Sequence, residues 1–334
     1  MRRLVWLSIV FAVLWTGWWF FAAQALQGGI VQWFEDRRAE SWQAEATSIE
    51  VSGFPLNLNA TMDAPSLADP ETGLAFSTTR LDLQAPAWRP GYVTLAFPQD
   101  PIVFASPLGK RNILATNAQA DLKLHNGAAL EVREMALTSD AWKVSAPEGS
   151  ILEAQGLVLS MRQDSDTPTR YAFDLQAPAF RLGDLPRAAF RVPADWPLTF
   201  DRLVVDMTAD FDRPFDLTAV EVARPQPRRI DLAVADAVWG ALSVRASAAL
   251  EVSAAGLLTG ELALQARNWR EILILAETAG IVPPGVRPQA ESILGALANG
   301  SGNPDTIDLK LTFRDGVVYL GFIPLGRAPV LILR

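Results

Sequence analysis

The sequence predicts a mainly β protein that carries an apolar helix at its N-terminus. Residues 4–21 form an apolar run, and apolar and polar residues alternate with period two in many segments after residue 46. Turn signals such as Arg314-Asp315-Gly316 separate these segments, and Asp-Gly can supply the positive φ angles of a tight hairpin turn. We therefore expect a long antiparallel meandering sheet, for which an open groove, a half-barrel and a sandwich-like form all remain open.

The first expected element is a transmembrane anchor with its helical extension, residues 1–34. No charge interrupts residues 4–34, and as a helix this stretch would reach roughly 46 Å, more than the approximately 30 Å hydrocarbon core of a bilayer. The side chains expected to anchor it are Leu4, Trp6, Leu7, Ile9, Val10, Phe11, Leu14, Trp15, Trp18, Trp19, Phe20 and Phe21.

A cleaved signal peptide is the alternative, because Ala23-Gln24-Ala25 fits the small-x-small rule for a cleavage site. The apolar region of a signal peptide is normally about 7 to 15 residues. The run here is longer, and its Trp residues are typical of an interfacial belt, which favours an uncleaved anchor.

The flanking charges predict the orientation of the anchor. Arg2 and Arg3 abut the apolar run, whereas Arg37 and Arg38 lie some distance beyond it. Cationic residues close to a span favour the cytoplasmic side. We expect the N-terminus inside and the β-rich domain, residues 35–334, outside, either as one domain or as two halves divided near Asp201.

Three segments show the strand pattern most clearly, at residues 203–211, 241–253 and 307–313, where apolar residues fill alternate positions. Such strands have one buried and one solvated face. The candidate apolar groove face comprises Val205, Met207, Leu242, Val244, Leu250, Leu262, Leu264, Leu309 and Leu311.

Helical signals after residue 46 are concentrated in residues 269–298. Asn268 is a good N-cap residue before the first helix, and Gly280 can end it. Pro288 and Asn299-Gly300 bracket a second helix. We expect this short pair to lie on the sheet.

A short sequence recurs in the chain, as LDLQAPAW at residues 81–88 and FDLQAPAF at 173–180, with weaker echoes that end at Trp239 and Trp269. The intervals are irregular, which excludes a fixed-period solenoid. The recurring unit predicts a strand, a turn and then an aromatic residue, Trp88 or Phe180 in the two clear copies, that pins the next segment to a core.

Composition excludes several classes of function. A net charge of −8 argues against nucleic-acid binding, which needs clustered cations. The absence of Cys excludes disulfides, thiolate metal sites and Cys nucleophiles. No nucleophile elbow, phosphate-binding glycine loop or zinc-binding helix motif occurs. We therefore expect no enzyme activity, no cofactor and no metal site.

Two polar features are the best candidates for chemistry. Asp206, Asp210 and Asp212 share one strand face, where carboxylates can bind a cation or share a proton. A solvated strand face is the favoured interpretation. The single histidine, His125, is interpreted as a polar residue at a hairpin end.

Three segments resemble a family. VSGFPLNL at residues 51–58, a long stretch at 238–273 and GVVYLGFIPLGRAPVL at 316–331 resemble a proteobacterial domain-of-unknown-function family of membrane-anchored envelope proteins, with nearly the whole chain covered. That family is distantly similar to AsmA-like proteins. The resemblance implies an inner-membrane anchor, a periplasmic β-rich domain, and phospholipid or lipidated envelope components as partners.

Three functions are therefore weighed. The first is lipid handling, in which lipid covers an apolar face too large for two short helices. The second is a scaffolding module whose sheet closes on itself. The third, a carboxylate-dependent hydrolase, is the weakest because only the aspartates above support it.

Overall fold

The computed structural model describes residues 2–125, 127, 129–221, 223–280, 282–283, 285–300 and 303–333. The chain forms two compact units. Unit 1 comprises Met1–Asn126 with Leu137–Pro147, and unit 2 comprises Gly127–Ala136 with Glu148–Arg334. Asp201 lies inside unit 2.

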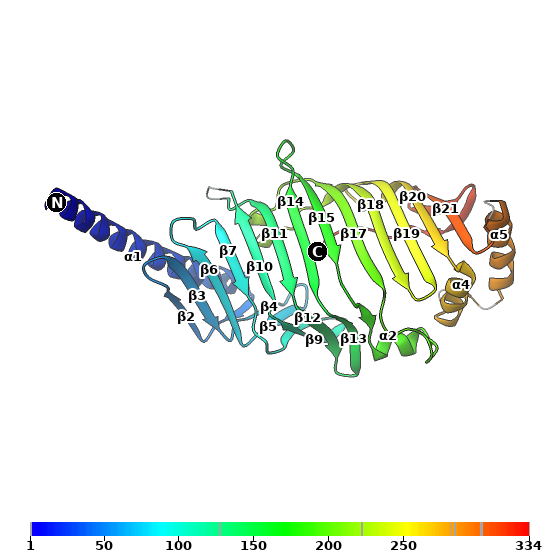
Figure 1. Cartoon of the computed structure of the whole chain (residues 1–334), viewed down its shortest axis with the longest axis horizontal. Helices are drawn as coiled ribbons and strands as arrows, with labels where there is room; N and C mark the ends of the chain where they lie inside the picture. Colours follow the sequence, from blue (N-terminus) through cyan, green and yellow to red (C-terminus); the bar gives the residue numbers. More distant parts are fainter. Residues whose placement is uncertain are drawn as a thin grey trace. The chain divides into compact units, whose positions relative to one another are not determined.

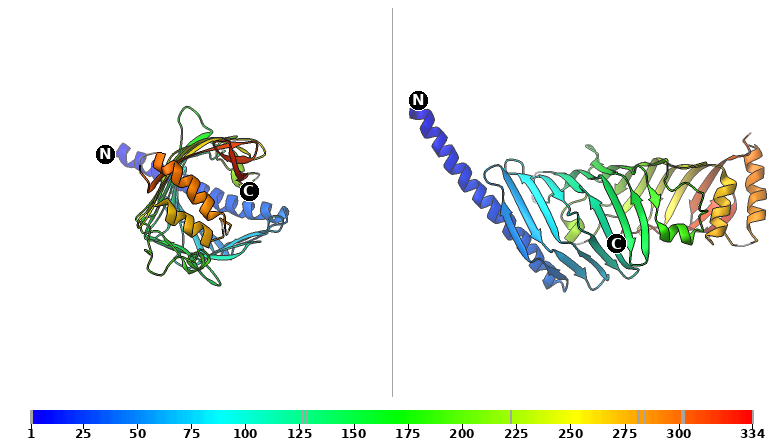
Figure 2. Two further views of the ribbon diagram at one scale, coloured as in Figure 1. Left: turned by 90° about the vertical axis from the view of Figure 1, so that its right-hand side faces the viewer. Right: turned by 60° about the horizontal axis from the view of Figure 1, so that its bottom comes forward.

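The N-terminal apolar run forms the first part of α1 (Arg2–Ala39), a single helix that continues past the apolar run and packs beside the first strands of unit 1 (Figures 1 and 2). Its first turns expose large apolar side chains, whereas Trp19, Ala23 and Phe34 are buried. The second half of α1 is therefore a packed element of unit 1.

Unit 1 contains two antiparallel sheets, and successive hairpins of the chain alternate between them. The first has the neighbour order β1 (Gln43–Glu45), β4 (Ser66–Asp69), β5 (Leu74–Ser77), β8 (Ile102–Ser106), β9 (Gly109–Thr116) and β12 (Ala141–Ala146). The second has the order β2 (Ser48–Ser52), β3 (Asn57–Asp63), β6 (Arg80–Pro86), β7 (Tyr92–Ala96) and β10 (Gln119–Leu124). Strand β11 (Val132–Ser139) contributes residues to both units.

One core of unit 1 joins α1 to both of these sheets. Phe34 from α1 packs with Ala44 of β1, Met62 of β3, and the partly buried Leu67 of β4 and Leu81 of β6. The two sheets and the helix thus share one apolar interior in this unit, which is the sandwich-like arrangement that the period-two pattern left open.

Unit 2 is a meander, as the sequence predicts (Figure 1). Its main sheet has the order β14 (Leu157–Gln163), β15 (Arg170–Gln176), β17 (Arg202–Phe211), β18 (Pro227–Trp239), β19 (Leu242–Val252), β20 (Leu258–Arg267), β21 (Thr306–Arg314), β22 (Val317–Leu320) and β23 (Ile323–Arg327). A short pair, β13 (Gly149–Ala154) and β16 (Arg181–Leu182), completes the unit. Among the described strands this order is linear, so the sheet is open and not a barrel.

The expected helical pair is confirmed as α4 (Trp269–Thr278) and α5 (Arg287–Gly300), which lie beside each other next to the strands of unit 2 (Figure 2). Two short helices, α2 (Asp184–Ala189) and α3 (Thr218–Glu221), were not expected. Asn268 is the N-cap residue of α4, as predicted, but its side chain makes no capping hydrogen bond. This residue is left-handed, with φ 54°, and its side-chain amide donates 2.6 Å to the carbonyl of Ala241 instead of capping α4.

The recurring segments form β6 and β15, each followed by a turn, but their aromatic residues differ in burial. Trp239 and Trp269, the aromatics of the two weaker echoes, are buried as expected. Trp88 is 57 % exposed, so its predicted place in a core is wrong. In that copy the buried residue is the preceding Ala87, which packs against Trp19 of α1 and leaves the indole outside.

Candidate functional site

The candidate site is the apolar face of the main sheet of unit 2. Strand pairing aligns its apolar residues into two rows that cross the strands at mid-length, which we call the central rows. One row is Leu175, Val205, Ala235, Ala246, Leu264 and Leu309. The other is Phe173, Met207, Leu232, Ala248, Leu262 and Leu311. Every residue of both rows is half-buried.

Helices α4 and α5 cover the strand ends on one side of the central rows. Trp269 and Leu273 of α4 pack with Ala298 of α5 against Ala266 and Ile307, all of them buried. The indole Nε1 of Trp269 also donates 3.0 Å to the carbonyl of Pro304, which fixes α4 to the segment before β21.

The C-terminal segment covers the strand ends on the other side. Ala328 is buried with Val252, Leu258 and Phe313. The backbone N–H of Leu331 donates 2.9 Å to the carbonyl of Gly256, which holds this segment along the turn between β19 and β20. In β19, β20 and β21 the apolar face is thus buried at both strand ends and half-exposed between them.

The opposite face of the same strands is charged and internally paired. Arg170 makes two hydrogen bonds to Asp210, of 2.6 and 2.9 Å, and Lys310 lies 2.7 Å from Glu261. Arg202 and Arg245 both reach the buried carboxylate of Asp236 at 3.0 Å. An apolar ligand could therefore bind only to the apolar face of this sheet, which carries the central rows.

The pKa of Asp236 lies below its ordinary value. Burial alone would raise it, but hydrogen bonds from Arg245 and Arg202, together with their positive charges, more than offset that effect. The pKa of Asp231 is also lowered, chiefly by its hydrogen bond from Arg229. These shifts have structural ion pairs as their cause, so they carry no sign of an acid or base catalyst.

The three aspartates considered from the sequence do not form a cluster. Asp206 is exposed, Asp210 is held by Arg170, and Asp212 lies 3.2 Å from Arg228. Among the residues that the structure describes, no group of three or more His, Asp or Glu side chains could hold a metal ion.

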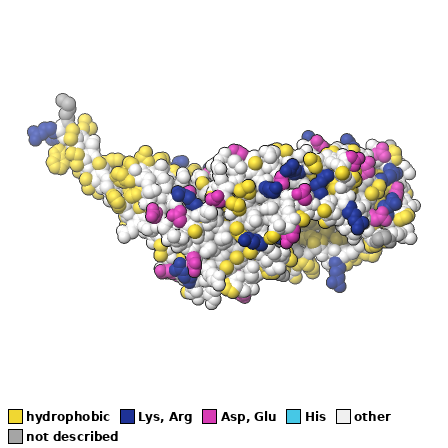
Figure 3. Space-filling model, turned by 90° about the horizontal axis from the view of Figure 1, so that it is seen from below, with side chains coloured by type: hydrophobic (Ala, Val, Ile, Leu, Met, Phe, Trp, Pro, Cys, Tyr) yellow, Lys and Arg dark blue, Asp and Glu magenta, His cyan; other side chains and the backbone are white. Residues whose placement is uncertain are grey.

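The predicted groove residues lie on this apolar face, in two settings. Val205, Met207, Leu262, Leu264, Leu309 and Leu311 belong to the central rows. Val244 and Leu250 are half-buried just beyond them, and Leu242 is buried at the start of β19. Figure 3 shows a hollow in which hydrophobic side chains gather, over its right-hand part, where Figure 1 has the strands of unit 2.

The predicted groove face left out half of the central rows: Phe173, Leu175, Leu232, Ala235, Ala246 and Ala248. The alternation in residues 241–253 had placed Ala246 and Ala248 on the inward side of that strand, but the other four were not identified. Phe173 and Leu175 lie in the recurring FDLQAPAF segment, which was interpreted only as a local turn motif. A β-bulge in β18 between Leu232 and Ala235 breaks the period of two there, and this break hides the strand's inward positions in the sequence.

The dimensions of the central rows suit a hydrocarbon chain. From β15 to β21 they cross five inter-strand spacings, roughly 24 Å at about 4.8 Å each. One acyl chain occupies half of a bilayer core, about 15 Å. A chain of that length fits across the strands within unit 2.

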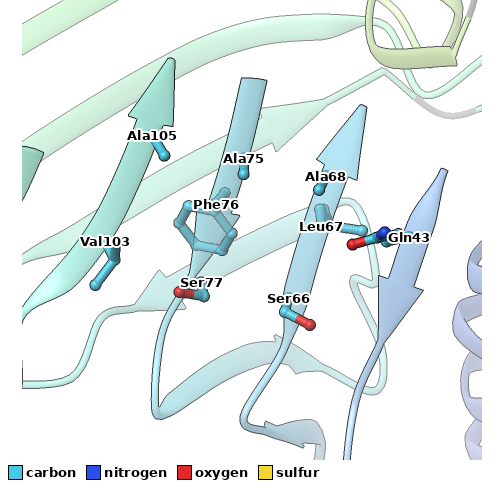
Figure 4. A pocket seen from close by; sticks show the side chains of 9 residues that line it. All are labelled: Gln43, Ser66, Leu67, Ala68, Ala75, Phe76, Ser77, Val103 and Ala105. Atoms are coloured by element: carbon cyan, nitrogen blue, oxygen red, sulfur yellow. The ribbon is translucent and has the colours of Figure 1, made fainter. Parts of the chain in front are cut away.

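Unit 1 has a separate small pocket of about 140 Å³ (Figure 4). Its lining comes from β1, β4, β5 and β8: Gln43, Ser66, Leu67, Ala68, Ala75, Phe76, Ser77, Val103 and Ala105. Typical ligand pockets measure about 300–1,000 Å³ and are well enclosed. This one is too small and too open to be the leading candidate.

The predicted anchor residues all lie on α1, which is long and apolar enough to cross a membrane. Most are exposed, between 46 % and 69 %: Leu4, Trp6, Leu7, Ile9, Val10, Phe11, Leu14, Trp18, Phe20 and Phe21. Trp15 is half-buried and Trp19 is 5 % exposed, because both pack against unit 1.

A family model described as "Uncharacterized protein conserved in bacteria (DUF2125)" matches residues 19–329. The chain belongs to this family. The expected membership of a bacterial domain-of-unknown-function family is thereby confirmed, while the likeness of DUF2125 to AsmA-like proteins stays a prediction. A comparison with curated proteins finds no match.

Proposed function

We propose that this DUF2125 member is a non-enzymatic, single-pass protein of the bacterial inner membrane. In this proposal its β-rich part lies in the periplasm, where the central rows of unit 2 hold an acyl chain of phospholipid or of a lipidated envelope component. The observation that carries the proposal is the central rows themselves, half-exposed between two covered strand ends.

The lipid assignment is supported by energetics. Each methylene group moved from water into an apolar site contributes about 0.8 kcal/mol, so a chain of ten contributes about 8 kcal/mol before the entropic cost of binding. The central rows present Leu, Val, Met, Phe and Ala with their charged neighbours on the opposite face. They can therefore bind a hydrocarbon chain without burying a charge.

An anchor that stays attached is supported by the packing of α1. Cleavage after Ala25 would remove Trp19 and Ala23, which are buried against Leu58 and Ala87 of unit 1. A disposable signal peptide has no need of such contacts. The periplasmic orientation rests on Arg2 and Arg3 at the start of the helix and on the resemblance to anchored envelope proteins.

The experiment fills the proposed site without disturbing the core. Ala248 lies in a central row between Leu232 and Leu262, and the next residue, Ala249, points to the charged face. The full chain is purified in mild detergent as wild type, Ala248→Phe and Ala249→Phe, and bound lipid is measured by mass spectrometry. We expect several-fold less lipid with Ala248→Phe and wild-type amounts with Ala249→Phe.

Equal lipid on all three proteins, with circular dichroism showing intact folds, would contradict lipid binding at the central rows. Absence of lipid from the folded wild type, even after incubation with phospholipid vesicles, would favour the scaffolding alternative.

A further inference from the structure

A loop of unit 1 lies beside α1 where the helix meets the body. The loop between β2 and β3, residues 53–56, has the sequence Gly-Phe-Pro-Leu. The indole Nε1 of Trp15 donates 2.9 Å to the carbonyl of Pro55, and that of Trp19 donates 2.8 Å to the carbonyl of Asn57. These bonds fix the height of the loop along the helix.

The free length of α1 is too short to cross a bilayer. Residues 2–14 precede the first contact, and 13 residues of helix rise roughly 20 Å, against a hydrocarbon core of approximately 30 Å. Crossing takes about 20 residues, which extends the span from Leu4 to Ala23. The level of Trp15, and with it Pro55, then falls inside the apolar layer.

The exposed side chains around this loop suit such a position. Phe54 is 51 % exposed, Leu56 55 % and Trp88 57 %. Trp88 belongs to the same surface because the N–H of Ala87 donates 2.8 Å to the carbonyl of Leu56. The ring of Phe54 stacks on Phe20 of α1 at 6.0 Å, which makes the loop and the helix one continuous apolar surface.

Four carbonyls of this segment, those of Gly53, Pro55, Leu56 and Asn57, have hydrogen-bond partners within the protein. An unpaired carbonyl in hydrocarbon costs several kcal/mol. The carbonyl of Gly53 accepts the N–H of Asn57 at 2.9 Å, and those of Pro55, Leu56 and Asn57 are paired as described above. Gly53 has φ +102°, and a Cβ there would lie 2.7 Å from the carbonyl oxygen of Asn57, so the tight turn requires glycine.

We propose that this loop surface, formed by Phe54, Leu56 and Trp88, enters the leaflet nearest unit 1 beside α1. It is a second membrane contact that holds unit 1 against the bilayer, and its occupant is phospholipid. The inference rests on the proposed function, because it takes α1 as a membrane span. The nearby Arg89 is exposed and adjoins Trp88, where it can meet lipid phosphate groups at the interface.

The test uses the absence of Cys from the chain, which lets single Cys residues carry a nitroxide label. Leu56→Cys reports on the loop, and Val10→Cys reports on the free part of α1. Leu108→Cys, at a position 89 % exposed in the turn between β8 and β9, is the aqueous control within unit 1. Each full-length protein is reconstituted into phosphatidylethanolamine–phosphatidylglycerol vesicles. Label collisions with oxygen and with a water-soluble nickel chelate are then measured.

We expect Leu56→Cys to be shielded from the nickel chelate several-fold relative to Leu108→Cys, at a depth shallower than Val10→Cys. A label at Trp88→Cys should give the same result independently. If positions 56 and 88 are as accessible as 108 while position 10 is shielded, the loop contact is refuted and the anchor stands. If position 10 is itself accessible, the anchor fails and both proposals fall.

Discussion

At the residue scale, Asp236 is the clearest test of the charged face. Its side chain is 7 % exposed and lies 3.0 Å from both Arg202 and Arg245. Removing its charge by Asp236→Asn leaves both guanidinium groups without their partner, and we expect the free energy of unfolding to fall by about 1–3 kcal/mol at neutral pH.

The pH dependence of this effect has a defined sign. Because the pKa of Asp236 is lower in the folded state, its stabilisation is complete above pH about 4, the ordinary Asp value, and is lost as the pH falls further. The difference in thermal midpoint between wild type and Asp236→Asn should therefore shrink below pH 4. Asp308→Asn, an exposed change on the same face, is the control. A difference that grows on acidification would contradict the assignment.

At the level of single residues, the sequence predicted correctly which strand positions face inward, but it did not predict which distant residues a side chain contacts. The period of two identified the inward positions of β19 and β21 because those strands have one apolar face. It could not foresee that the Asn268 amide binds the carbonyl of Ala241, 27 residues earlier, or that Trp88 stays outside. Both outcomes depend on which distant segment of the chain packs beside the residue in the folded protein.

At the scale of elements, α4 helps to cover the strand ends on one side of the central rows. Trp269 is 3 % exposed among Leu273, Ala298 and Ile307. Trp269→Ala removes a large buried side chain, so we expect the free energy of unfolding to fall by about 3–5 kcal/mol. Thermal unfolding in detergent, followed by circular dichroism, measures it.

Ile274→Ala is the matched control in the same helix, since that side chain is 47 % exposed. It should cost less than about 1 kcal/mol. Equal costs for the two changes would show that α4 is not packed through Trp269.

Element prediction succeeded where a signal was local. Residues 269–298 contain helix-length apolar spacing between Gly and Pro breakers, and two helices form there. The alternation of hairpins between two sheets in unit 1 was not predictable, because strand partners β3 and β6 are separated by the β4–β5 hairpin of the other sheet. The composition of a single strand does not indicate to which of the two sheets it belongs.

At the scale of the whole molecule, the chain combines a long apolar N-terminal helix with an open sheet that has one apolar face. The sequence predicted both parts. The long uncharged run indicates the helix, and the alternation of apolar and polar residues indicates strands with one apolar face. It could not predict the central rows, whose alignment depends on the register of six strands and on the bulge in β18. Nor could it predict how much of α1 is covered by the strands and loops of unit 1.

The most direct measurement of the central claim is a photo-crosslink from two adjacent positions of β20. Leu264 lies in a central row, and Ala263 points to the charged face. A benzophenone amino acid is placed at one or the other in the living bacterium, and the irradiated full-length protein is analysed by mass spectrometry. We predict a lipid adduct at position 264 and none at 263. Adducts at neither position, or equally at both, would contradict the claim that the central rows hold an acyl chain.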